Sequence, residues 1–102
     1  AGGLNAARKA ARLDPINAEI SLNFGRLLYM QGERQAAINE FERLVKANPQ
    51  FAEGHLSLGI AYGEAGRLDA AMAEFREVLR IQPNHPEARK NLDLAAQMLK
   101  AR

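Results

Sequence analysis

One stretch of the chain decides the fold. Residues 52–85 read AEGHLSLGIAYGEAGRLDAAMAEFREVLRIQPNH, and the preceding residues 18–51 read AEISLNFGRLLYMQGERQAAINEFERLVKANPQF. When the two stretches are aligned, ten positions hold the same residue: Ala18/Ala52, Glu19/Glu53, Leu22/Leu56, Gly25/Gly59, Gly32/Gly66, Ala36/Ala70, Ala37/Ala71, Glu40/Glu74, Phe41/Phe75 and Pro49/Pro83. Pro15, Pro49 and Pro83 repeat the same interval of 34 residues (49 − 15 and 83 − 49). A period of this size is typical of a stacked array of repeats.

Apolar residues at helical spacing predict two helices in each period. The helices are expected at residues 17–31, 34–47, 51–65, 67–81 and about 86–100. Asn17 is the expected N-cap of the first of them, and Gly32 and Gly66 are placed to end helices in the left-handed conformation. Asn84 or His85 is expected to cap the last helix. Because all connections are short, consecutive helices should be antiparallel neighbours.

The first 14 residues predict one further helix that starts late, because Gly2 and Gly3 are poor helix formers. Pro15 is expected to stop this helix and to bias Asp14 away from the α region. Its alanine-rich face has no evident cover. That face would receive another repeat in a longer parent chain or a second copy of the array, and the sequence leaves open whether the N-terminus is native or cut.

Composition narrows the functional classes. The 102 residues suit one domain, with 47% hydrophobic and 25% charged residues. The net charge of +2 is small and both signs are interspersed, so no basic face predicts a nucleic-acid partner. No apolar run approaches the roughly 18 residues that membrane insertion requires. There is no cysteine, and the compartment stays open between cytoplasm and periplasm.

No pattern in the chain predicts catalysis. The two histidines, His55 and His85, stand 30 residues apart (85 − 55), and the serines are Ser21 and Ser57. Ser57 follows His55 closely, but side chains two positions apart on a helix diverge. No cluster has metal-ligand spacing, and no glycine-rich phosphate loop is present. We therefore expect no catalytic residue, no metal and no cofactor.

The repeat resembles the tetratricopeptide repeat, a 34-residue helix–turn–helix. The residues that carry the resemblance are Leu58-Gly59, Tyr62, Gly66, Ala71, Phe75 and Pro83 in one repeat, and Phe24-Gly25, Leu28, Gly32, Ala37, Phe41 and Pro49 in the other. The resemblance implies an all-α fold, an α-solenoid of antiparallel helix pairs wound into a right-handed superhelix with a concave inner surface. Residues 18–51 and 52–85 would be full repeats within one array over residues 1–102, flanked by a half unit at 3–14 and a capping helix at 86–102.

The repeated glycines, alanines and phenylalanines are expected to pack together. A glycine in mid-helix costs about 1 kcal/mol relative to alanine, which is sensible where a neighbouring helix approaches closely. Ala37 and Ala71 are the small residues expected opposite Gly25 and Gly59, with Phe41 and Phe75 filling the space between repeats. In the last helix Asp93 stands at the glycine position, which suits a terminal helix with no partner after it.

The resemblance also implies a binding groove for a peptide or protein segment, lined by the first helix of each repeat. The residues at the groove positions are Glu19, Leu22, Asn23, Arg26, Tyr29, Met30, Glu53, Leu56, Ser57, Ile60, Glu64, Glu87, Lys90, Asn91 and Leu94. The alternative is that Leu22, Leu56 and Ile60 are ordinary core residues.

The groove residues say little about the chemistry of the binding partner. One branch of the family clamps the C-terminal carboxylates of chaperones with lysine, asparagine and arginine. Leu22, Arg26, Ser57, Glu87 and Asn91 hold the matching places here, so that clamp is absent. Glu19, Glu53 and Glu87 share one repeat position; they either favour a partner with basic character or serve the helix dipole.

The function that follows is a protein–protein interaction scaffold without enzymatic activity. Two alternatives stay open. One is a structural array that forms a homo-oligomer through its N-terminal helix. The other is the scaffolding part of a larger enzyme or secretion-system protein.

Overall fold

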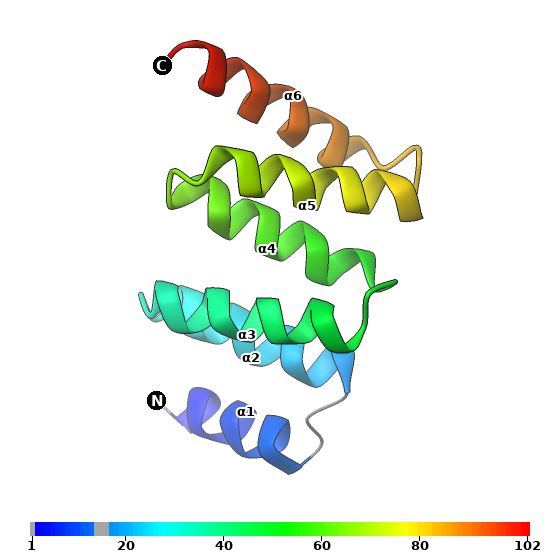
Figure 1. Ribbon diagram of the computed structural model, residues 1–102. Helices are drawn as coiled ribbons and strands as arrows, with labels where there is room; N and C mark the ends of the chain where they lie inside the picture. The colour runs from blue at the N-terminus through cyan, green and yellow to red at the C-terminus, as the bar shows by residue number, and fades with distance from the viewer. Residues whose placement is uncertain (1, 14–16) are drawn as a thin grey trace. The chain divides into compact units, whose positions relative to one another are not determined.

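A computed structural model describes residues 2–13 and 17–102 of the chain, and this part is all-α, with six helices and no strand (Figure 1). The helices are α1 (Gly2–Leu13), α2 (Ala18–Met30), α3 (Arg34–Ala47), α4 (Ala52–Glu64), α5 (Leu68–Ile81) and α6 (Pro86–Lys100). The residues group into two compact units, Ala1–Gly54 and His55–Arg102. We call these the N-terminal unit and the C-terminal unit, and describe each by itself.

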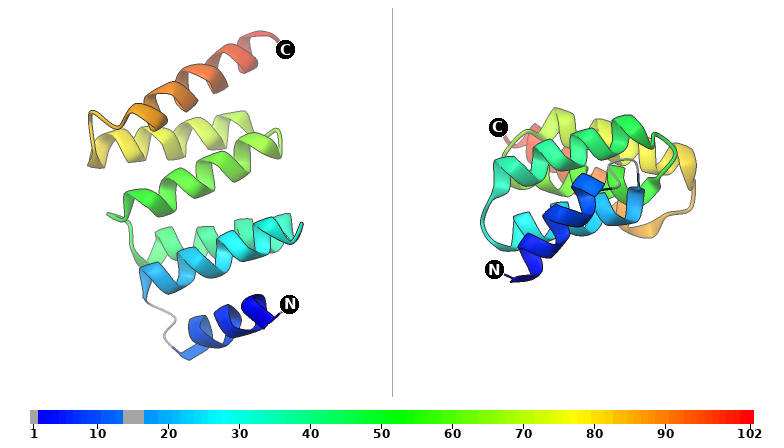
Figure 2. Two further views of the ribbon diagram at one scale, coloured as in Figure 1. Left: turned by 180° about the vertical axis from the view of Figure 1, so that it is seen from behind. Right: turned by 90° about the horizontal axis from the view of Figure 1, so that it is seen from below.

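In the N-terminal unit, α2 packs against both of its neighbours in the sequence, α1 and α3 (Figure 2). The short α2–α3 connection makes these two helices an antiparallel pair, as the sequence predicts. Leu22, Leu28, Ile38, Phe41 and Leu44 are buried and form the centre of this unit. Burying a side chain of this size stabilises the fold by about 1.5–3 kcal/mol.

Helix α1 differs from its prediction in two ways. It begins at Gly2 and includes Gly3, so the expected late start is wrong. Its alanine face is not left uncovered, because Ala7 and Ala11 are buried in the described structure and α1 packs on α2. This packing can hold a helix whose first residues have low propensity. The predicted stop at Asp14 and Pro15 lies outside the described residues.

In the C-terminal unit, α5 contacts both α4 and α6. The buried residues of this unit come from α4, α5 and α6, and include Leu58, Ala61, Tyr62, Leu68, Ala71, Phe75, Val78, Ala88 and Ala95. This second helix pair uses apolar positions at the same offsets as the first, which is the consequence of the 34-residue period.

The predicted helix ends are confirmed at four positions. The Asn17 side chain accepts a hydrogen bond from the Ile20 backbone N–H at 3.1 Å. Gly32 and Gly66 adopt positive φ values of 84° and 80°, a conformation in which glycine avoids the steric cost of a Cβ atom. Of the two candidates for the α6 cap, His85 is the one used, since its Nδ1 accepts from the Ala88 N–H at 3.1 Å.

The expected partner of the mid-helix glycines is corrected. A Cβ atom at Gly59 would lie 2.6 Å from Cε1 of Phe75, and a Cβ at Gly25 would meet the same ring atom of Phe41. The close neighbour is thus the phenylalanine ring of the same helix pair, and not Ala37 or Ala71. The repeat pattern identifies a glycine, an alanine and a phenylalanine position in each repeat. It does not show that the glycine contacts the phenylalanine.

Candidate protein-interaction site

The groove positions on α2 divide into a buried part and an exposed part. Glu19, Asn23, Arg26 and Met30 are exposed, Tyr29 is half-buried, and Leu22 is buried with 3% of its surface accessible. Leu56, the equivalent residue in α4, is buried as well. Leu22 and Leu56 therefore occupy the core, which is one of the two alternatives that the sequence leaves open.

Two polar contacts order the exposed residues of the N-terminal unit. Arg26 forms an ion pair with Glu53 over 3.5 Å, and both side chains are about half exposed. Exposed pairs of this kind contribute only about 0–1 kcal/mol. Tyr29 accepts a hydrogen bond from Arg34 at 2.8 Å, and the Arg34 guanidinium lies 4.4 Å from the centre of the ring. Tyr29 is consequently covered on one face by its own chain.

The C-terminal unit contains a cleft of about 540 Å³ between α4 and α6, with α5 as its floor. Five predicted groove residues line it: Ile60, Glu64, Glu87, Asn91 and Leu94. Gly59, Gly63, Leu68, Phe75, Ala95 and Met98 complete the lining. We call this feature the α4–α6 cleft. Lys90 and Ser57 are not among its lining residues; Lys90 is exposed and Ser57 is half-buried.

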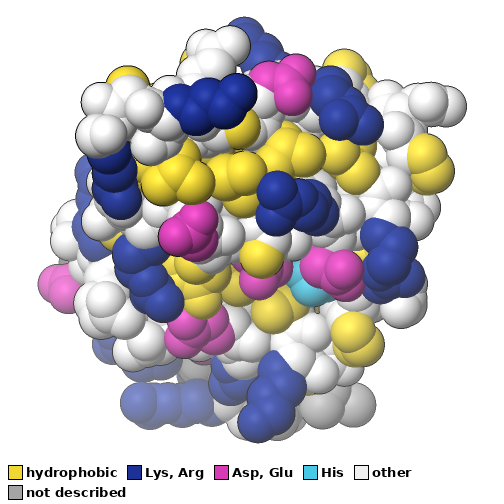
Figure 3. Space-filling model, turned by 45° about the horizontal axis from the view of Figure 1, so that its top comes forward, with side chains coloured by type: hydrophobic (Ala, Val, Ile, Leu, Met, Phe, Trp, Pro, Cys, Tyr) yellow, Lys and Arg dark blue, Asp and Glu magenta, His cyan; other side chains and the backbone are white. Residues whose placement is uncertain are grey.

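The α4–α6 cleft combines an apolar wall with acidic residues. Leu94 and Met98 are 50% and 51% exposed, which is high for large apolar side chains on a folded domain. Glu64 comes from the end of α4 and Glu87 from the first turn of α6. In Figure 3, which is turned so that the end of the chain with α6 comes forward, hydrophobic side chains lie among Lys, Arg, Asp and Glu side chains. Such a surface suits an apolar anchor with basic neighbours.

Met98 is the main residue that the sequence-based groove missed. The predicted groove leaves out Met98, although Met98 lies one period after Glu64 and two periods after Met30, and both of these are predicted groove positions. Glu87, Asn91, Leu94 and Met98 nevertheless follow one another at spacings of four, three and four residues. That spacing puts them on one helix face, and it could have identified Met98.

Two partly buried polar contacts involve the same repeat positions in the two repeats. In the N-terminal unit, Arg43 donates to the Ser21 hydroxyl at 2.9 Å and also pairs with Glu40. In the C-terminal unit, His55 Nδ1 lies 2.7 Å from a carboxylate oxygen of Glu74. Ser21 and His55 are 34 residues apart, as are Glu40 and Glu74. The repeat pattern predicts none of these contacts.

Within residues 2–13 and 17–102, no three histidine or acidic side chains converge where a metal ion could bind. In the same ranges, none of the helices is both long and apolar enough to cross a membrane.

Comparison with known proteins agrees with the repeat pattern. A family model described as "Tetratricopeptide repeat" matches residues 22–86. No curated protein sequence matches the chain closely enough to count as a relative.

Several solved structures share the fold. The first TPR domain of Spaghetti (RPAP3), bound to the HSP90 peptide SRMEEVD, is 22% identical with a TM-score of 0.89, over 95% of this chain and 77% of that one. MamA is 27% identical with a TM-score of 0.89, and the match covers 95% of this chain and 57% of MamA. The TPR domain of Arabidopsis OM64 is 20% identical with a TM-score of 0.86, over 93% and 78% of the two chains.

Proposed function

The chain belongs to the tetratricopeptide repeat family, and from this premise we propose that it is a protein-interaction module that binds a segment of a partner protein in the α4–α6 cleft. The family is one of protein-interaction repeats, so a scaffold role is the coarse function. The finer assignment rests on one observation, the pair of half-exposed apolar side chains Leu94 and Met98 beside a cleft of about 540 Å³.

The charges at the cleft favour a segment with basic character. Glu64 and Glu87 both line the cleft, and their negative charges attract a lysine or arginine in the bound segment. Glu87 also lies in the first turn of α6, where its charge stabilises the helix dipole. Both roles are compatible, because a carboxylate has two oxygens that can accept hydrogen bonds.

A clamp for a C-terminal carboxylate is not part of the proposal. Of the five places that such a clamp uses, Leu22 is buried, Arg26 pairs with Glu53, and Glu87 carries the wrong charge. The HSP90 peptide bound by RPAP3 provides a direct probe. We expect its free-acid and amidated forms to bind this chain equally weakly.

The test uses a fluorescent helical peptide with two leucines four residues apart, flanked by lysines. Fluorescence anisotropy should detect binding to the wild-type chain, and Leu94→Asp should weaken it about tenfold or more, since an unpaired carboxylate would enter an apolar contact. Leu13→Asp is the matched control, because Leu13 is also an exposed leucine but belongs to α1. Equal affinities of wild type and Leu94→Asp would contradict the cleft assignment.

A further inference from the structure

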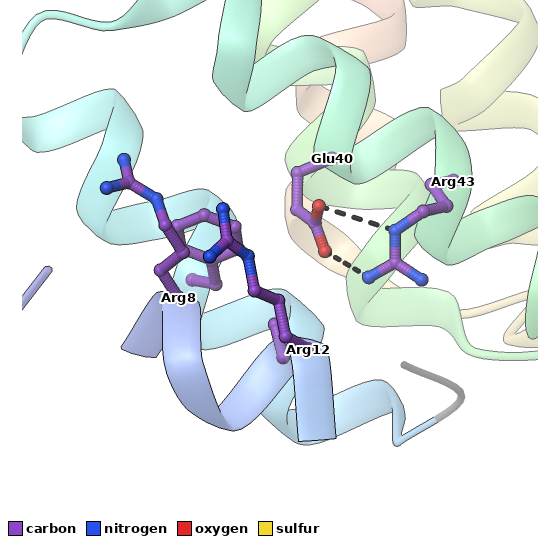
Figure 4. Close-up of a pocket in the computed structure, with 6 residues that line it drawn as sticks. Arg8, Arg12, Glu40 and Arg43 are labelled. Atoms are coloured by element: carbon purple, nitrogen blue, oxygen red, sulfur yellow. Dashed lines mark hydrogen bonds and ion pairs between the residues drawn. The ribbon is translucent and has the colours of Figure 1, made fainter. Parts of the chain in front are cut away.

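The N-terminal unit has a concavity of its own, with different chemistry. It measures about 320 Å³ and is lined by residues from α1, α2 and α3: Arg8, Ala11, Arg12, Phe24, Glu40 and Arg43 (Figure 4). Three of the six are arginines and one is a glutamate, so the pocket carries two positive charges in excess. We call it the arginine pocket. It shares no residue with the α4–α6 cleft.

One of the three arginines is held in place by its own unit. Arg43 donates to the Ser21 hydroxyl, which is 1% exposed, and pairs with the Glu40 carboxylate, whose side chain is 12% exposed. The Glu40 charge is therefore balanced by Arg43 within the wall. Arg43 shapes one side of the pocket, and the excess positive charge comes from the other two arginines.

Arg8 and Arg12 stand four residues apart on α1, which places their side chains one turn apart on the same face. The Arg8 guanidinium lies 5.8 Å from the centre of the Phe24 ring. Figure 4 shows the Arg8 and Arg12 side chains extending from α1 on one side of the pocket, with the Glu40–Arg43 pair on the other side. Like charges at this spacing repel by about 0.2–0.5 kcal/mol, and an anion between them would turn that repulsion into attraction.

The repeat itself does not require this set of arginines. One period further along the chain, Glu42 and Lys46 stand at the places of Arg8 and Arg12 (8 + 34 and 12 + 34), and Glu77 stands at the place of Arg43 (43 + 34). Two periods further, Arg76 and Arg80 occupy the first two places, but Arg80 pairs with Glu77 at 3.2 Å. The fold is thus maintained with other charges at these positions.

We propose that the arginine pocket binds an acidic side chain presented by a partner protein, with Arg8 and Arg12 holding the carboxylate and Phe24 contacting the apolar part of the bound segment. Guanidinium groups hold carboxylates and phosphates in paired hydrogen bonds. The lining also holds Ala11 and Phe24, which can contact the apolar part of a peptide side chain and have no such contact to make with inorganic phosphate, so the observations favour a glutamate or aspartate. This ligand is opposite in charge to the one proposed for the α4–α6 cleft.

The experiment is an NMR titration of the intact chain with an acetylated and amidated peptide that contains a phenylalanine between glutamates. We expect shifts of the Arg8 and Arg12 side-chain Nε–Hε signals and of the α1 amides. The variant Arg8→Gln/Arg12→Gln should bind about tenfold more weakly or worse, given the strength of charge-assisted hydrogen bonds. Circular dichroism confirms that the variant is folded.

The control variant is Arg76→Gln/Arg89→Gln, which removes the same charge from exposed positions of α5 and α6. We expect its affinity to stay within about twofold of wild type, because neither residue lines the arginine pocket and salt at 0.1 M screens exposed charges. Equal losses in the two variants would show a net-charge effect and overturn the proposal. Displacement of the peptide by an equal concentration of inorganic phosphate would also overturn it, because the site would then be a phosphate site.

Discussion

At the scale of single residues, the two repeats differ at a position where a polar group is buried. Ser21 and His55 share one repeat position, yet the first contacts Arg43 and the second contacts Glu74. The sequence showed that these positions differ, but it gave no reason to pair them, because the partners lie 22 and 19 residues away on another helix. A pattern of apolar spacing reports which face is buried and carries no information about contacts between polar side chains.

The His55–Glu74 contact should contribute measurably to stability. His55→Leu removes the partner of a mostly buried carboxylate, so the free energy of unfolding should fall by about 1–3 kcal/mol. Urea denaturation followed by circular dichroism measures the change. The double variant His55→Leu/Glu74→Leu should recover most of the loss, because it also removes the carboxylate that was left unpaired. A double variant as unstable as the sum of the single ones would contradict this account.

Gly59 is expected to tolerate no side chain. A Cβ atom there would lie 2.6 Å from the Phe75 ring, so Gly59→Ala should lower the free energy of unfolding by about 1–3 kcal/mol. Gly3→Ala is the control, since no atom lies within 4 Å of its Cβ position and alanine is the better helix former. That variant should be more stable by up to about 1 kcal/mol. Thermal unfolding of both variants measures these changes. A Gly59→Ala variant as stable as wild type would contradict the close contact between Gly59 and Phe75.

At the scale of helices, the sequence predicts most of what the structure shows. Caps, glycine ends and apolar spacing are local signals, so five helices could be placed to within one or two residues of the observed bounds. The start of α1 could not be predicted in this way, because packing of Ala7 and Ala11 decides it. Five residues of the predicted groove line the α4–α6 cleft, and the repeat period is what selected them; their role in binding stays a prediction. The arginine pocket combines residues at unrelated repeat positions, and no period points to it.

The N-cap of α6 provides a test at this scale. His85→Ala removes the Nδ1 acceptor of the Ala88 N–H, so α6 should lose about 0.5–2 kcal/mol of stability. Amide hydrogen exchange in the first turn of α6 would measure the loss. Asn84→Ala is the matched control, because Asn84 is the neighbouring cap candidate that α6 does not use, and its exchange rates should equal those of wild type. Equal acceleration in both variants would contradict the assigned cap.

At the scale of the whole molecule, the chain consists of two compact units, each with its own helix pair and buried residues. Repeat arrays gain stability from local packing, so their parts can differ in stability. The period predicts one array over residues 1–102 with full repeats at 18–51 and 52–85, and this division into repeats stays a prediction. The superhelical path implied by the family resemblance remains a prediction.

A destabilising change should therefore act locally. Gly59→Ala lies in the C-terminal unit, and we expect faster amide exchange in α4 and α5 with a smaller change in α2 and α3. Hydrogen exchange followed by mass spectrometry resolves the helices separately. If protection fell by the same factor throughout the chain, the two units would unfold as one cooperative body.

The unlike polar contacts at Ser21 and His55 also bear on how a repetitive chain avoids assembling wrongly. Similar helix pairs can exchange partners during folding. If α4 took the place of α2 on α3, His55 would meet Glu40 at the place of Glu74, but Arg43 would lose the Ser21 hydroxyl to which it donates. If α2 took the place of α4 on α5, Ser21 would leave the Glu74 carboxylate without its imidazole partner. Each first helix thus matches its own second helix, and the polar groups discriminate between apolar surfaces that are otherwise nearly interchangeable.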